Sequence, residues 1–238
     1  VTLTGGFGEI RIGREYSPTF WNTTIYDPFG TNGIGSSNAP GMVANVCALR
    51  CDNSVSYLMA ASGVSVHAMY AFGEKASNVD DNTGDYMGIR VAYAAGPLDV
   101  AAAIGNAKGV TGPADVRSTN FGISYDLGMA KPMLQLGQDK NDATKVTNWL
   151  LGVTVPMGQG EIRAAYSHYD TKNSNADWSK IAVGYGYNLS KRTQLYGTLA
   201  KVSNSAGASK VVDNRGLAGS AALDGSSSGY EFGVRHSF

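Results

Sequence analysis

Along most of this chain, apolar residues alternate with polar or very small residues at a period of two. This period places successive side chains on opposite faces of a β-strand. Almost no segment shows the 3.6-residue period of an amphipathic helix. The pattern therefore predicts an all-β protein whose strands carry one apolar face and one face of polar or small residues. In residues 178–188, for example, one parity holds Ile181, Val183, Tyr185 and Tyr187, and the other holds Lys180, Ala182, Gly184 and Gly186.

Turn residues divide the chain into about thirteen such segments of about ten residues each, a length that suits a tilted strand crossing a bilayer. Short turns alternate with longer connections, which is typical of antiparallel membrane barrels and not of soluble sandwiches. The expected strands are 1–5, 8–14, 54–60, 64–72, 85–95, 98–106, 117–127, 130–139, 146–156, 161–170, 178–188, 193–203 and 228–238, and the expected long connections are 15–53, 73–84, 107–116, 140–145, 171–177 and 204–227.

The residue types on the two faces indicate which face meets water. Lys, Glu and Thr normally crowd the wet surface of a soluble barrel, but here the polar face is rich in Gly, Ala and Ser beside isolated charges. Tyr and Trp lie near strand ends on the apolar parity, as Tyr125, Trp149 and Tyr187 do, which is typical of interfacial aromatic girdles. We therefore expect a transmembrane antiparallel β-barrel, a single domain over residues 1–238, with a polar lumen and an apolar exterior.

The composition excludes three other classes of protein. The 19 Lys and Arg residues balance 19 Asp and Glu residues, so no basic surface for nucleic acid is expected. The aromatic and β-branched content is too high for charge-driven disorder. No run of about 18 uninterrupted apolar residues occurs, which excludes a transmembrane helix.

The three histidines, His67, His168 and His236, do not suggest catalysis. His168 follows Ser167 and His236 precedes Ser237, but adjacent strand residues point to opposite faces, so neither pair can form a nucleophile and its base. No P-loop or H-E-x-x-H motif occurs. We expect no enzymatic activity, no cofactor and no metal site.

Four segments resemble motifs of the Gram-negative outer-membrane porins, in particular the trimeric general porins with 16 strands. Residues 233–238 resemble the aromatic C-terminal signal that is read by the barrel-insertion machinery, and residues 187–196 resemble the motif before the penultimate strand. Residues 7–14 resemble the strand that leads into the folded-in third loop, and Tyr26-Asp27 matches an early motif of that loop. The expected assembly signal consists of Tyr230, Phe232, Val234 and Phe238.

The resemblance implies that residues 15–53 form a constriction loop that folds into the barrel and narrows the pore. A connection this long is expected to be functional or disordered, and its apolar residues favour packing. Arg14 matches the arginine at the loop entrance, and Asp27 lies where the loop turns acidic groups toward the pore. Alternatively, Arg14 pairs with Glu9 or Glu15 at the end of a strand.

Other charges lie on the lumen parity of the expected strands. Glu9 and Arg11 are expected at the constriction together with Arg14 and Asp27. Inward cations slightly outnumber inward carboxylates, so rings of wall charge predict a mild preference for anions. The expected pore-wall cations are Arg90, Lys131, Arg163, Lys180 and Arg235.

Cys47 and Cys51 form a C-x3-C pair within the same long connection. The expected compartment permits disulfides, so we favour a disulfide between them. Free thiols are the second alternative, and a metal site is the third, although no His or further Cys lies nearby.

These observations predict a channel for the passive diffusion of ions and small hydrophilic solutes. The alternatives are a substrate-specific channel and a plugged barrel with a structural or adhesive role. The expected partners are outer-membrane lipid, two further copies in a homotrimer, and the insertion machinery. Because single-chain bacterial barrels have an even number of strands, we also expect that three to four N-terminal strands precede Val1 in a barrel of 16.

Overall fold

The structure is a computed structural model that describes residues 1–74, 82–109, 115–172, 174, 176–213 and 221–238. Parts of the expected connections 73–84, 107–116, 171–177 and 204–227 therefore lie outside the described residues. No helix in the described ranges has the length and apolar character that a membrane crossing requires.

Strands dominate the described chain, as the alternating pattern predicts. Their boundaries follow the expected ones closely, and the largest difference is that β3 begins at Arg50 and not at residue 54. One helix, α1, was not expected. The elements are β1 (Thr2–Gly5), β2 (Gly8–Tyr16), α1 (Pro18–Ile25), β3 (Arg50–Ala61), β4 (Val64–Ala71), β5 (Tyr86–Ala95), β6 (Leu98–Ala107), β7 (Val116–Tyr125), β8 (Lys131–Lys140), β9 (Lys145–Met157), β10 (Gly160–Lys172), β11 (Trp178–Asn188), β12 (Thr193–Asn204) and β13 (Ser226–His236).

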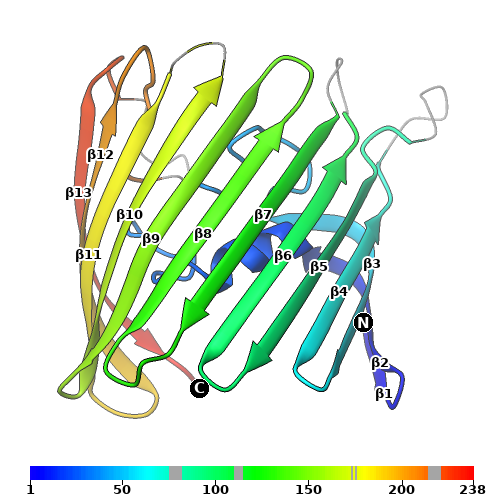
Figure 1. Cartoon of the computed structure of the whole chain (residues 1–238), viewed down its shortest axis with the longest axis horizontal. Coiled ribbons are helices and arrows are strands. Elements are labelled where there is room, and N and C mark those ends of the chain that lie inside the picture. The colour runs from blue at the N-terminus through cyan, green and yellow to red at the C-terminus, as the bar shows by residue number, and fades with distance from the viewer. Residues whose placement is uncertain (75–81, 110–114, 173, 175, 214–220) are drawn as a thin grey trace. The chain divides into compact units, whose positions relative to one another are not determined.

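The strands form one sheet in which each strand neighbours those that precede and follow it in the chain, from β1 to β13 (Figure 1). The pairs from β1–β2 to β5–β6, and those from β10–β11 to β12–β13, are antiparallel. Contacts divide the chain into two compact units. Unit 1 comprises Val1–Thr23, Ala39–Ile123 and Leu136–Val146, and unit 2 comprises Thr24–Asn38, Ser124–Gln135 and Thr147–Phe238.

In both units the apolar parity of the strands is exposed and the polar parity is covered. On β11 in unit 2, Ile181 and Val183 are half exposed, whereas Lys180 and Ala182, which alternate with them, are buried. On β5 in unit 1, the residues from Met87 to Tyr93 show the same alternation. This arrangement is the reverse of a soluble sheet protein, and it is the polarity expected of a membrane barrel. We call the two sides the apolar face and the polar face.

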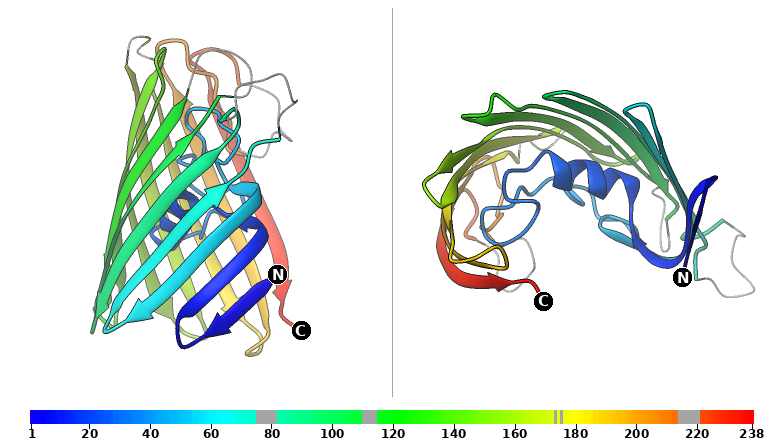
Figure 2. Two further views of the ribbon diagram at one scale, coloured as in Figure 1. Left: turned by 90° about the vertical axis from the view of Figure 1, so that its right-hand side faces the viewer. Right: turned by 90° about the horizontal axis from the view of Figure 1, so that it is seen from below.

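The long connection between β2 and β3 begins with α1, the coiled ribbon in both views of Figure 2. Ser17 caps the helix, because its Oγ accepts a hydrogen bond from the backbone N–H of Phe20 at 3.3 Å. Pro18 occupies the first helical position, where the backbone N–H that proline lacks would have no acceptor within the helix. Pro28 follows shortly after the last helical residue, where a helix cannot easily continue. Only the Ser17-Pro18 pair could have signalled this helix in the sequence.

Candidate functional site

The first half of the connection is bound to the polar face of unit 1 by an amide network. The Asn22 side chain of α1 donates from Nδ2 to Oδ1 of Asn120 on β7 at 2.8 Å. Asn120 in turn donates from Nδ2 to the carbonyl oxygen of Thr19 at 2.9 Å. Nε of Arg90 on β5 donates to Oδ1 of Asn22 at 3.0 Å. Helix residues that no motif had singled out thus hold the start of the connection against β5 and β7.

Arg90 lies on the polar face of β5, as its parity predicts, and it is half-buried. Its register partner on β4 is His67, which is buried on the same face. Among the residues that the structure describes, Arg90 forms no ion pair with a carboxylate. Its guanidinium is therefore a positive charge that is held in place by an amide oxygen and not neutralised by an acid.

Arg11 lies on the polar face of β2, but it is neutralised there by two carboxylates. Its Nε donates to Oε1 of Glu9 at 2.7 Å, and its Nη1 donates to Oε2 of Glu15 at 2.9 Å. Glu9 and Arg11 thus lie side by side on the polar face of β2. Glu15 was expected only as an alternative partner of Arg14. It completes a triad with Glu9 and Arg11 that carries one excess negative charge.

The structure separates Arg14 from this triad, which corrects its expected place at the constriction. Arg14 shares the apolar face of β2 with Ile10 and Ile12, since residues 11 and 15 both face the other side. Its Nη1 donates to both carboxylate oxygens of Asp52 on β3 at 2.9 Å. The two side chains are 62% and 54% exposed. The expected alternative, pairing with Glu9 or Glu15, is also wrong, because Arg11 binds both of those acids.

Asp27 also differs from its expected role, because its carboxylate is buried inside the connection in unit 2. Oδ1 accepts the backbone N–H of Phe29 at 2.9 Å, and Oδ2 accepts the backbone N–H of Ser37 at 2.7 Å. Burial raises the pKa of the Asp27 carboxyl above its ordinary value, although these two N–H donors act in the opposite direction. Asp27 therefore fixes the fold of residues 27–37 and does not present a charge to open water.

Small residues on the polar face let this second half of the connection approach the strands. A Cβ at Gly152 on β9 would lie 2.4 Å from Cγ of Pro28, and a Cβ at Gly184 on β11 would lie 3.0 Å from Cε1 of Phe29. Farther along, the backbone N–H of Asn38 donates to the hydroxyl of Tyr169 on β10 at 2.7 Å. The abundance of glycine on this face thus has a packing reason.

A cavity of about 350 Å³ lies between the connection and the polar face of β10, β12 and β13 in unit 2. Arg163 and Arg235 supply its positive charges, and Glu231 supplies a negative charge. Arg163 donates from Nε to Oε1 of Glu161 at 2.9 Å, while Nη2 of Arg235 donates to Oε1 of Gln194 at 3.1 Å. The cavity is thus polar and hydrogen-bonded, as an aqueous lining requires. Its other lining residues include Phe29, Asn32, Gly33, Tyr196 and Thr198.

Glu231 also joins the connection to β13. Its Oε2 accepts the backbone N–H of Ile34 at 2.8 Å. A Cβ at Gly33 would lie 2.7 Å from the same carboxylate oxygen, so the absence of a side chain there permits the close approach. A carboxylate that parity alone would place on an open wall is therefore engaged by the backbone of the connection.

The remaining predicted wall cations lie on the polar face, but they are not equally open. Lys180 on β11 is only 2% exposed, and its Nζ donates to the carbonyl oxygen of Val212 at 2.9 Å. Its expected role as an open wall charge is therefore wrong, because the segment around Val212 covers it. Lys131 on β8 is half-buried and shares its face with the buried residues Met133 and Gln135.

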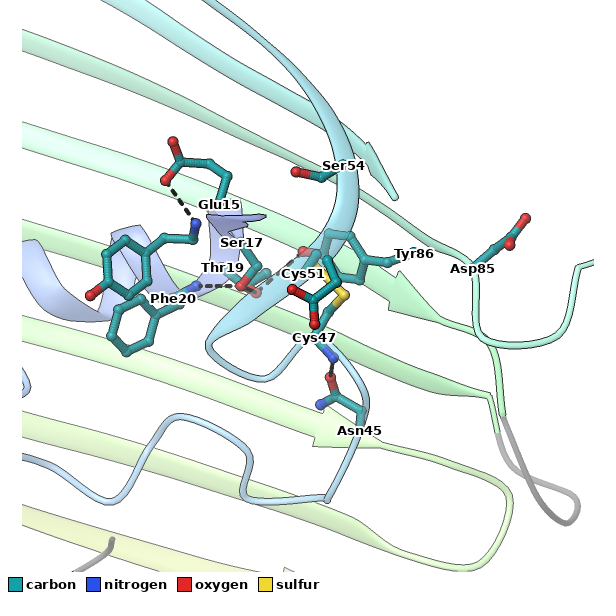
Figure 3. The surroundings of a disulfide bond; sticks show 12 residues. Glu15, Ser17, Thr19, Phe20, Asn45, Cys47, Cys51, Ser54, Asp85 and Tyr86 are labelled. Atoms are coloured by element: carbon teal, nitrogen blue, oxygen red, sulfur yellow. Dashed lines mark hydrogen bonds between the residues drawn. A yellow bond between two sulfur atoms is a disulfide. The ribbon is translucent and has the colours of Figure 1, made fainter. Parts of the chain in front are cut away.

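The structure joins Cys47 and Cys51 in a disulfide at the point where the connection returns to β3 (Figure 3). Their Cα atoms are 4.8 Å apart, and both side chains are buried against Met69, Ala71, Tyr86 and Ala107. The hydroxyl of Tyr86 lies 3.4 Å from Oγ1 of Thr19 at the other end of the connection. The backbone N–H of Ser17 donates to the carbonyl oxygen of Leu49 at 2.9 Å. Both ends of the connection are therefore fixed beside each other in unit 1.

Comparison with known proteins supplies the family. A family model described as Gram-negative porin matches residues 1–207. Outer membrane porin protein 32 of Delftia acidovorans is 35% identical over 254 aligned residues, which cover the whole chain and 72% of that protein. An outer membrane porin protein of Bordetella pertussis is 25% identical over 82% of the chain and 63% of its own length.

A solved structure agrees with these relatives. The anion-selective porin from Comamonas acidovorans is 34% identical, and its superposition covers all of this chain and 76% of that one with a TM-score of 0.88. The expected all-β antiparallel fold class, the outer-membrane location and the resemblance to porins are thereby confirmed. The chain belongs to the family of Gram-negative porins.

Proposed function

We propose that this porin passes small anions more readily than small cations, and that the connection between β2 and β3 sets the width of its passage. Porins are channels through which ions and small hydrophilic solutes diffuse passively. The observation that carries the proposal is the position of Arg90, a charge on the polar face beside the connection without a carboxylate partner in the described chain. The name of the related Comamonas protein, an anion-selective porin, supports the same preference.

Two other described cations of the polar face are paired with carboxylates, and Arg90 lies directly beside the connection, which makes Arg90 the charge to test. Arg11 is outnumbered by Glu9 and Glu15, and Arg163 is paired with Glu161. Close opposite charges leave a field that falls off steeply with distance, whereas an unpaired guanidinium attracts anions over roughly a Debye length. Selectivity in this proposal therefore depends on local pairing and not on net charge.

Reversal potentials in a salt gradient test the proposal directly. The purified protein in a planar bilayer with a gradient of KCl is expected to give a potential of the sign that favours chloride. Arg90→Gln keeps a hydrogen-bonding side chain but removes the charge, and it is expected to lower the ratio of anion to cation permeability by up to about 5-fold.

Arg14→Gln is the matched control, because Arg14 lies on the apolar face and is already paired with Asp52. It is expected to leave the permeability ratio unchanged. A wild-type channel that prefers cations, or equal effects of the two substitutions, contradicts the proposal.

We further propose that the connection 17–49 is the constriction loop of the channel. The bonds from α1 to Asn120 and Arg90 in unit 1, and those from residues 34 and 38 to β13 and β10 in unit 2, support this role. Exclusion of sized polymers tests it: deletion of residues 30–37 is expected to raise both the conductance and the size of the largest polymer that enters. An unchanged cut-off contradicts the proposal.

The proposal includes a homotrimer and no catalytic step. OmpT of Vibrio cholerae, which shares the fold at 18% identity, was solved in a trimer form. Tyr230, Phe232, Val234 and Phe238 are all strongly exposed, which leaves them accessible to lipid and to the insertion machinery. Light scattering in detergent tests the trimer, and a monomer mass contradicts it.

Ser167 is buried on the polar face of β10 while His168 faces the other side, so they do not form a nucleophile and base.

A further inference from the structure

Lys201 is a cation on the apolar face of unit 2. It is exposed on β12, and its register partners are Ile181 on β11 and Ser228 on β13. The next row on the same face consists of Val183, Leu199 and Tyr230, which are paired in the same way. A charged side chain is costly on a surface that faces hydrocarbon, unless it lies at the edge of the membrane or has a partner there.

A hollow of about 470 Å³ lies beside Lys201 on this face. It is lined by the two rows and by the small residues Ala182, Ala200 and Gly229 between them. Apart from Lys201 and Ser228, its lining side chains are hydrocarbon or aromatic. Within the described ranges, no hydrogen bond or ion pair involves the ammonium group of Lys201. The surface therefore combines an apolar hollow that suits an acyl chain with a cation that has no partner among the described residues.

The position of Lys201 along the strands places it at a boundary. On the side of the β11–β12 turn, the apolar face continues with residues such as Tyr185, Leu195 and Phe232. On the opposite side, toward the long connections, the next residues on this face are Ser179, Ser203 and Ser226. Lys201 lies six positions after Leu195, a rise of about 20 Å along the strand. Lys201 therefore lies where the apolar band ends on the side of the long connections.

In outer-membrane barrels the long connections are extracellular, so this edge of the band meets the outer leaflet. We propose that Lys201 and the adjoining hollow bind a phosphorylated glycolipid of the outer leaflet. An acyl chain lies in the hollow against Val183, Leu199 and Tyr230, and a headgroup phosphate accepts a hydrogen bond from the Lys201 ammonium. Charge complementarity and the coincidence of the cation with the end of the apolar band carry this assignment. Lys is a compact charge that suits a single phosphate oxygen.

Binding of defined lipids to the purified protein in detergent tests the proposal. The probes are lipid A with two phosphates, the same lipid without phosphates, and inorganic phosphate alone. Native mass spectrometry over a concentration series gives apparent dissociation constants. The wild-type protein is expected to bind the phosphorylated lipid more tightly than the dephosphorylated one and to show no retained inorganic phosphate. Lys201→Gln is expected to weaken binding of the phosphorylated lipid about 5-fold and to leave the dephosphorylated lipid unaffected.

Two further variants separate charge from shape. Lys201→Arg is expected to restore most of the affinity, whereas Val183→Phe, which fills the hollow, is expected to weaken binding of both lipids. The matched control is Lys191→Gln in the exposed β11–β12 turn, at the other end of the same hairpin. Equal affinities of Lys201→Gln and Lys191→Gln overturn the proposal. Loss of subunit assembly in Lys201→Gln with unchanged lipid binding also overturns it and assigns the hollow to a second copy of the chain.

Discussion

At the scale of single residues, the partners of a charge decide what it does. Arg11, Arg14 and Arg90 are three arginines of one unit, yet the first is held by two carboxylates, the second forms an exposed pair on the apolar face, and the third donates to an amide oxygen. Parity in the sequence correctly placed Arg11 and Arg90 on the polar face. It did not assign their partners: Glu9 and Glu15 share the strand of Arg11, whereas Asn22, which binds Arg90, lies on α1, 68 residues away in the sequence.

Asp27 provides a prediction about pH. Its pKa is raised by burial, so the protonated form is favoured in the folded state more than in the unfolded state, where the ordinary value is about 3.9. The stability that Asp27 contributes is therefore fully present below that value and is lost as the pH rises through the folded-state pKa. Relative to Asp27→Asn, the wild-type protein is expected to gain thermal stability as the pH falls from 7 to about 3.5.

Thermal midpoints of the two proteins, measured side by side across this pH range, check the prediction. Their difference cancels the contributions of the other titrating groups. A difference that stays constant, or that moves against the wild-type protein at low pH, contradicts burial of the carboxylate.

At the scale of elements, the strands followed from the sequence, whereas α1 did not. Alternation over about ten residues is a strong signal, because a slip of one residue would move every side chain to the wrong face. The helix is short and has apolar and polar residues on all sides, so its only local signals are Ser17 and Pro18. Its position depends on bonds to β5 and β7, which are distant in the sequence.

Asn120→Ala is expected to loosen α1, because it removes the amide that binds the Thr19 carbonyl and the Asn22 side chain. The Thr19 carbonyl keeps the hydroxyl of Thr23 as a donor, but the Nδ2 group of Asn22 loses its partner, which costs about 1 to 3 kcal/mol. The substitution is expected to increase the open-channel current noise and the frequency of closures in single-channel recordings.

Thr119→Ala is the control, since Thr119 is exposed on the opposite face of the same strand. It is expected to behave as the wild-type protein does. Indistinguishable recordings from the two variants would show that the amide network does not hold the connection.

At the scale of the whole molecule, the inverted polarity of the sheet carries the membrane assignment. Large hydrophobic side chains are exposed in both units, and the polar face is covered by the connection. The small residues of the polar face, such as Gly152 and Gly184, permit that covering because a side chain would occupy the space of Pro28 or Phe29. The two faces therefore have separate physical roles, one toward lipid and one toward the connection and water.

Val183→Arg tests which face meets lipid. A charge inside the apolar band, one row from its end, is expected to reduce the stability of the protein folded in lipid vesicles by about 1 to 2 kcal/mol, between the costs at the midplane and at the interface, because hydrocarbon cannot solvate it. Denaturant-induced unfolding in vesicles provides the measurement.

Ser179→Arg, on the same face and strand but beyond the end of the apolar band, is expected to cost only about 0 to 1 kcal/mol. Equal costs at the two positions would contradict the assignment of the apolar face to the membrane interior.

The sequence by itself determined the strands, their two faces and the membrane-barrel class, because these depend on a local period of two and on residue type. It also placed Arg90, Arg163 and Arg235 on the polar face. Only the tertiary structure decided that Asp27 and Lys180 are buried, that Arg14 pairs with Asp52, and that Arg90 binds Asn22. The physical reason is that burial and pairing depend on which distant segments meet, and the segments that cover these charges, the connection between β2 and β3 and the segment around Val212, have no periodic pattern of their own.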